Sequence, residues 1–301
     1  MTVTWRQTTL AYPLLAVLLF SMAGCHRSKP DLTVTAAPDA KISFSGYQMP
    51  AQNYPPTSDP SIILDRVSAA YHKLNGFQSQ SSAKIQLGTA SGVPYYQTTV
   101  FRFQLPNRVY LKSNDPQQGE ILIACDGNTI AYYYGAHDSY MREVAPKTLE
   151  EVCAKITHDA PQLLDPIVFL ANANIPMEIT HPILAGITQV NGRKALIIRS
   201  DISTSWLQSI SKAAGLPNKG YRLMKAVVTA YVDQQTYCLL RVKHDLEWAP
   251  VSGTHTAQAR SIILKADETF STVVANPSFP PDAFRYVPKP GTHELIQEPQ
   301  S

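Results

Sequence analysis

Histidine, cysteine and serine side chains could support hydrolysis, metal binding or thiol exchange, but their spacing here fits no motif for these reactions. The chain has no H-E-x-x-H, no histidine pair four residues apart and no C-x-x-C. Gly88-Thr-Ala-Ser-Gly92 has Ala90 where a nucleophile elbow needs serine. We therefore predict that the protein is not an enzyme, has no catalytic or metal site and uses no cofactor.

Cys25 is the one residue to which the sequence assigns a specific modification. Arg6 supplies a basic start, Leu10–Phe20 is an apolar run, and Ser21-Met-Ala-Gly precedes the cysteine. The run is too short for a membrane span, which takes about 20 residues, but is typical of a secretory signal. The small residues before Cys25 resemble the bacterial lipobox. We predict a lipoprotein signal peptide over residues 1–24 and lipidation of Cys25 with acyl chains such as palmitate.

The residues after Cys25 favour an extended tether rather than a folded element. Five prolines occur between residues 26 and 58, and no apolar period is sustained. A flexible chain of that length spans on the order of 30 Å. His26 replaces the aspartate that retains lipoproteins in the inner membrane of enteric bacteria, by resemblance to their sorting rule. We expect a tether over residues 25–58 and a location at the outer membrane, facing the periplasm.

Composition excludes several other classes of protein. The formal charge is only +3, without a long basic run, so nucleic-acid binding is not expected. Hydrophobic residues make up 44% of the 301 residues, which is enough for a substantial core. Cys125, Cys153 and Cys238 remain after export. One disulfide in any of three pairings, or three core thiols, is compatible with the sequence.

The apolar periodicity predicts one helix followed by antiparallel strands. Asp59-Pro60 starts a helix that ends near Asn75-Gly76. Strands with a period of two follow, with hairpin turns at Asp126-Gly127 and Asn191-Gly192. Thr148-x-x-Glu151 is a capping box that predicts a further helix at 148–156, and others are expected at 165–170 and 206–214. We predict an α+β fold in which a few helices cover one face of a single antiparallel sheet.

Three segments carry a resemblance to a known family. These are Val100-Phe-Arg-Phe-Gln-Leu-Pro-Asn107, Gly119-Glu-Ile-Leu-Ile-Ala-Cys-Asp-Gly-Asn-Thr129 and Ala283-Phe-Arg-Tyr-Val-Pro-Lys-Pro-Gly291. In this order they resemble the periplasmic lipoprotein carriers of the LolA/LolB superfamily. The resemblance covers residues 59–291 and leaves a tail at 292–301. It implies a curved, half-open barrel whose concave apolar face holds acyl chains under helices.

One position departs from that family. The carriers have an arginine before the Pro-Asn turn, which holds the lid closed, whereas this chain has Leu105. The resemblance therefore implies binding of acyl chains. It does not imply transfer of the bound ligand under a lid that an arginine holds closed.

The leading hypothesis is a membrane-anchored, non-catalytic periplasmic protein that binds lipid or lipoprotein acyl chains in an apolar cavity. The alternatives are an RseB-like envelope sensor on the same fold, with an unknown protein partner, and a hydrolase with nonlocal catalytic residues. Candidates for the cavity lining follow from strand parity and the helical period. They are Ile63, Val67, Phe101, Phe103, Val109, Leu111, Ile121 and Ile123.

Overall fold

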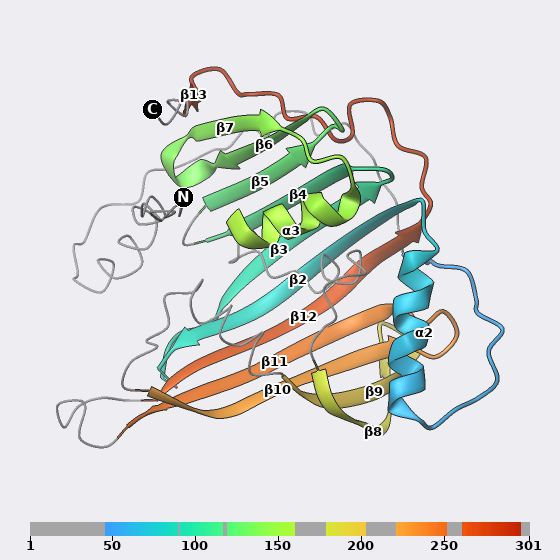
Figure 1. Cartoon of the computed structure of the whole chain (residues 1–301). Coiled ribbons are helices and arrows are strands. Elements are labelled where there is room, and N and C mark those ends of the chain that lie inside the picture. Colours follow the sequence, from blue (N-terminus) through green and yellow to red (C-terminus); the bar gives the residue numbers. More distant parts are fainter. Residues whose placement is uncertain are drawn as a thin grey trace, which may run out of the picture. The chain divides into compact units, whose positions relative to one another are not determined.

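The computed structural model describes residues 46–89, 91–116, 119–159, 179–202, 221–251 and 261–295 (Figure 1). The predicted signal peptide, Cys25 and residues 26–45 lie outside the described residues, as do the helices expected at 165–170 and 206–214. In the described ranges no helix is both long and apolar enough to span a membrane. Nor does this part of the chain contain a cluster of potential metal ligands.

Two helices form where the capping residues predict them. α2 (Pro60–His72) starts after Asp59, whose carboxylate accepts from the amides of Ser61 and Ile62. α3 (Leu149–Asp159) starts after Thr148, whose Oγ1 accepts from the Glu151 amide while the Glu151 carboxylate accepts from the Thr148 amide. This reciprocal pair is a capping box.

The strands form one large sheet in the order β13-β7-β6-β5-β4-β3-β2-β12-β11-β10-β9-β8, with β1 beside β12. Their bounds are β1 (Tyr47–Gln48), β2 (Gly76–Gly88), β3 (Tyr95–Gln104), β4 (Arg108–Asp115), β5 (Gly119–Cys125), β6 (Thr129–Tyr134), β7 (Ser139–Val144), β8 (Ile179–Val190), β9 (Arg193–Ile202), β10 (Tyr221–Asp233), β11 (Leu239–Pro250), β12 (Ile262–Ala275) and β13 (His293–Glu294). The pairs are antiparallel, except for the short β1 and β13, which pair in parallel with β12 and β7.

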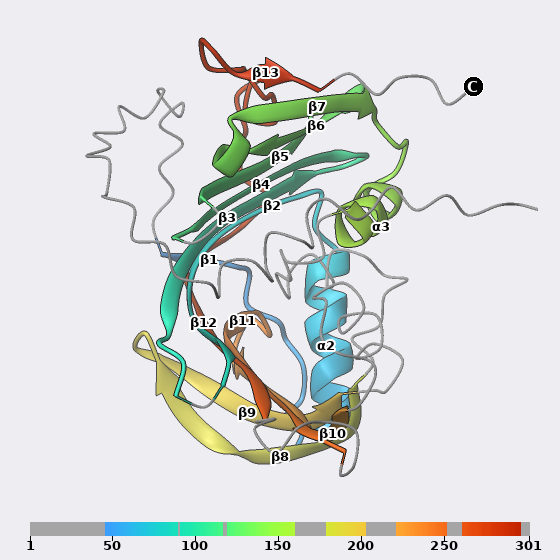
Figure 2. The same cartoon turned by 90° about the vertical axis from the view of Figure 1, so that its left-hand side faces the viewer.

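The sheet is curved and unclosed, and α2 and α3 lie on its concave side (Figure 2). The predicted α+β fold, a half-open barrel with helices on the concave face, is therefore confirmed. Asn191 and Gly192 both have positive φ, 50° and 77°, as a two-residue hairpin turn requires.

The ends of the domain contain structure that sequence periodicity did not indicate. β1 lies within the expected tether and β13 within the expected tail. β1 pairs with Val273 and Val274 of β12, beyond the point where the β11 register ends. Tyr54 packs edge-on against Tyr237 at 5.5 Å. Residues 46–58 are thus attached to the sheet, and the rest of the tether stays a prediction.

The sheet separates two apolar clusters. The larger lies on the concave face and includes the buried residues of α2 and α3. The smaller lies on the outer face, where Ala283 and Phe284 of the C-terminal segment pack on β4–β7. Alternation along β4 serves both clusters, because Val109 and Leu111 face inward while Tyr110 faces outward.

Candidate functional site

The structure brings the eight predicted lining residues together on the concave face. Each is at most 4% exposed and belongs to the larger cluster. Phe101 is opposite Leu111, which is opposite Ile123, across β3, β4 and β5. The ring of Phe77 lies 5.7 Å from that of Phe103. These side chains form a closed core beside α2, and a cavity-lining role for them stays a prediction.

A band of polar side chains crosses the concave face next to this closed core. We call Ser81, Gln97, Thr99, Ser113 and Glu268 the polar band. Register places all five on the face of Phe77 and Phe101. The Ser81 hydroxyl donates to Glu268 Oε1 at 2.5 Å, and Gln97 Nε2 donates to Ser113 Oγ. Ser81, Thr99, Ser113 and Glu268 are buried.

The polar band was missed because inward positions of a strand were assumed to be apolar. Its signal was present in the sequence, since Ser81 and Thr99 share strand parity with Phe77 and Phe101. A polar group is costly to bury unless it is hydrogen-bonded, so the band interrupts the apolar face for a structural or a ligand-binding reason.

Beyond the polar band the concave face becomes apolar again and is less covered. We call Ile85, Leu87 and Leu264 the open end. Leu87 is opposite Leu264, and Leu264 is opposite Leu246. Leu87 is 40% exposed, whereas the lining candidates are at most 4% exposed. The open end is therefore a part of this face where an apolar ligand would cover exposed hydrocarbon.

His244 lies on the same face, opposite Val228 and Ala266. Burial disfavours its protonated form and lowers its pKa to about 4. The neighbouring outward positions carry charge instead. Arg241 forms a bidentate ion pair with Asp267, and Lys225 pairs with Asp245. The outer face of these strands next to His244 thus carries ion pairs.

The remaining predicted positions have defined places or lie outside the described residues. Cys25 is among the latter. Leu105 is 46% exposed at the turn between β3 and β4, and its amide donates to the Asn75 carbonyl. Cys125, Cys153 and Cys238 are buried free thiols, and burial raises the pKa of each. A lid-latch role at Leu105 stays untested.

Comparison with known proteins places the chain in a family. Residues 61–296 match the family model described as "Predicted periplasmic protein (DUF2092)", and the chain belongs to that family. This supports a location in the periplasm or cell envelope. No curated protein matches the sequence significantly.

Several solved structures are similar in fold. Lipoprotein LppX of Mycobacterium tuberculosis has a TM-score of 0.39 at 13% identity, covering 71% of this chain and 95% of its own. A LolA-superfamily protein of Nitrosomonas europaea has a TM-score of 0.30 at 10% identity, covering 76% and 99%. MucB of Pseudomonas aeruginosa, solved with MucA, has a TM-score of 0.35 at 15% identity, covering 73% and 59%. Each of these is a likeness in fold alone.

Proposed function

We propose that the chain is a lipid-anchored envelope protein that binds the acyl chain of a lipid or lipoprotein on its concave face, without bond chemistry. The observation that carries the proposal is the open end, where Leu87 stays 40% exposed on the same face as the fully buried apolar core and across the polar band from it. Because only 40% of Leu87 is left to cover, an acyl chain over it yields about 0.6–1.2 kcal/mol, which is that share of the roughly 1.5–3 kcal/mol for a fully exposed leucine.

The polar band fits this proposal as the limit of the acyl site. Hydrocarbon cannot satisfy the hydrogen-bonding groups of Ser81 and Glu268, so a chain lying along the face is expected to stop there. An ester or hydroxyl group of the ligand could pair with the band. The ligand class that fits is therefore an amphiphile with its polar group toward the band and its chain over Leu87.

Displacement of a fluorescent fatty acid from the purified protein tests the acyl site. Leu87→Asp is expected to weaken binding about tenfold or more, because it places a charge where the chain lies. Tyr96→Asp is the matched control, since Tyr96 is 64% exposed on the opposite face of neighbouring strand β3. Equal affinity of the Leu87 variant and the wild type would contradict the proposal, as would failure of the wild type to bind the probe.

The anchor is tested separately by Cys25→Ala. Attachment of two or three acyl chains makes membrane binding effectively permanent, at about 0.8 kcal/mol per buried methylene. The variant is expected to leave the membrane fraction, or to stay unprocessed, while keeping its affinity for the probe. Normal processing and normal fractionation with the outer membrane would show that Cys25 does not anchor the protein.

A further inference from the structure

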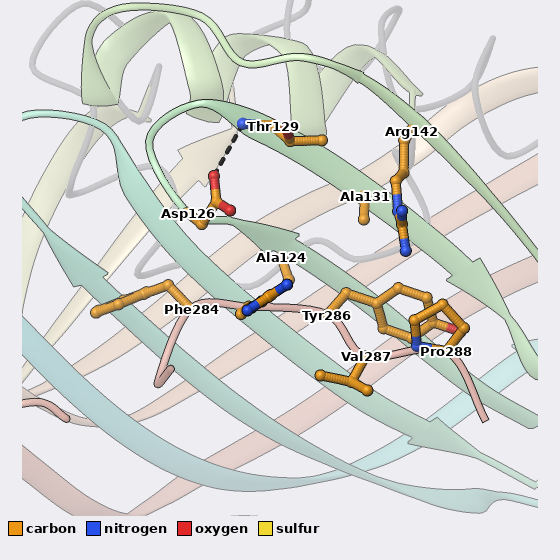
Figure 3. Close-up of a pocket in the computed structure, with 10 residues that line it drawn as sticks. Ala124, Asp126, Thr129, Ala131, Arg142, Phe284, Tyr286, Val287 and Pro288 are labelled. Carbon is orange, nitrogen blue, oxygen red and sulfur yellow. Dashed lines mark hydrogen bonds between the residues drawn. The ribbon is translucent and has the colours of Figure 1, made fainter. Parts of the chain in front are cut away.

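A second hollow lies on the outer face of the sheet, opposite the concave side. Its floor is Ala124 of β5 and Ala131 of β6, which are opposite each other, with Arg142 of β7 next in the same row. The C-terminal segment forms the wall, through Phe284, Arg285, Tyr286, Val287 and Pro288 (Figure 3). We call this hollow the outer pocket.

The outer pocket exists because small residues interrupt a row of large ones. Tyr110 is opposite Ala124 on one side, and Arg142 is opposite Ala131 on the other. Phe284 is 1% exposed and fixes the C-terminal segment, and Tyr286 stacks on Tyr133 at 5.6 Å. The methyl groups of Ala124 and Ala131 are too short to fill the space between these larger side chains. They leave a hollow with a volume of about 210 Å³.

Two guanidinium groups belong to the outer pocket. Arg142 and Arg285 are exposed, and neither pairs with a carboxylate in the described part of the chain. In Figure 3 the Arg142 side chain extends from its strand toward the C-terminal segment, and its guanidinium lies 4.9 Å from the ring centroid of Tyr140.

The one acidic residue of the pocket is already engaged. Asp126 Oδ1 accepts from the amides of Asn128 and Thr129, both at 2.9 Å, which closes the turn between β5 and β6. Two arginines and one aspartate leave the pocket with a net charge of +1.

We propose that the outer pocket binds a phosphate group carried by a small organic substituent. The planar donors of two guanidinium groups suit the several oxygens of one phosphate, and the half-buried Tyr286 and the exposed Val287 suit an apolar or glycerol substituent. The volume is below the roughly 300–1,000 Å³ of drug-sized sites, so a headgroup fits and an acyl chain does not. The phosphate could come from a phospholipid headgroup or from a free phosphate ester.

Isothermal titration calorimetry of the full chain in detergent tests the assignment with two probes. Glycerol 3-phosphate represents the free ester, and dihexanoylphosphatidylglycerol below its micelle concentration represents the lipid headgroup. Arg142→Gln and Arg285→Gln are each expected to weaken binding about tenfold or more, and Ala131→Leu, which fills the floor, is expected to abolish it. Arg222→Gln, at an exposed arginine of β10, is the control and is expected to bind as the wild type does.

Binding of either probe that depends on both arginines supports the proposal, and the probe that binds identifies the source of the phosphate. Binding of neither probe, or equal binding by all variants, would overturn it. Tighter binding of hexanoate than of both phosphate probes would overturn the assignment to phosphate. Because the fatty-acid site is on the other face, failure here leaves that proposal standing, and the reverse also holds.

Discussion

Acidification is expected to destabilise the protein through His244. Burial lowers the pKa of this imidazole to about 4, against 6.5 for the ordinary side chain. The folded state therefore holds His244 neutral, and the unfolded state takes up a proton first as the pH falls. The contribution of His244 to the free energy of unfolding is therefore fully present above pH 6.5 and is lost as the pH falls from 6.5 to about 4.

The magnitude follows from the difference between the two pKa values. At 1.36 kcal/mol per unit, 6.5 minus 4 corresponds to about 3 kcal/mol. Because the side chain retains some exposure, we expect about 2–3 kcal/mol. Burial lowers this pKa, and a desolvation penalty is not screened by salt.

Urea unfolding at pH 7 and pH 4 measures this loss. The wild type loses stability from carboxylates as well, so the informative quantity is the difference between the wild type and His244→Gln. The variant is expected to lose about 2–3 kcal/mol less than the wild type over this pH range. His137→Gln, at an exposed histidine, is expected to behave as the wild type does. Equal losses in the wild type and His244→Gln would refute the reasoning.

Two further predictions concern stability and are measured by urea unfolding at pH 7. Arg193→Met removes the guanidinium that donates to Asp233, a carboxylate only 2% exposed, and is expected to cost about 3–5 kcal/mol; a loss below 1 kcal/mol would show that the ion pair is dispensable. Phe101→Ala removes a ring that is fully buried and is expected to cost about 3–5 kcal/mol, against at most about 0.5 kcal/mol for Tyr96→Ala on the outer face of the same strand. A small loss for Phe101→Ala would mean that the ring borders empty space rather than core.

The fold was predictable because its determinants are local. Asp59-Pro60, Thr148 with Glu151, and Asn191-Gly192 each specify their own cap or turn, and the structure confirms all three. β1 and β13 were not predictable, because two-residue strands have no period. They form where a longer strand leaves an edge beside it, as β12 does beyond the end of its β11 register.

The candidate site was less predictable than the fold, since strand parity selects a face and not a position along it. Phe101 and Leu87 both face inward, yet Phe101 is fully buried and Leu87 is 40% exposed. The difference depends on which segments pack over each end of the sheet, and those contacts are long-range. The outer pocket had no sequence signal at all, because Ala124 and Ala131 are unremarkable until the C-terminal segment lies across them.

The two proposed sites lie on opposite faces of one sheet and on different strands of it. Inward-facing positions of the sheet provide hydrocarbon surface that ends at hydrogen-bonded polar groups, whereas outward-facing positions of β5–β7 provide a shallow, positively charged pocket. A one-residue change of register in β5 would exchange Ile123 and Ala124 between the faces, which would destroy the outer pocket and disrupt the closed core. The turns that fix this register, such as the one closed by Asp126, are therefore expected to matter to binding as much as the residues that touch a ligand.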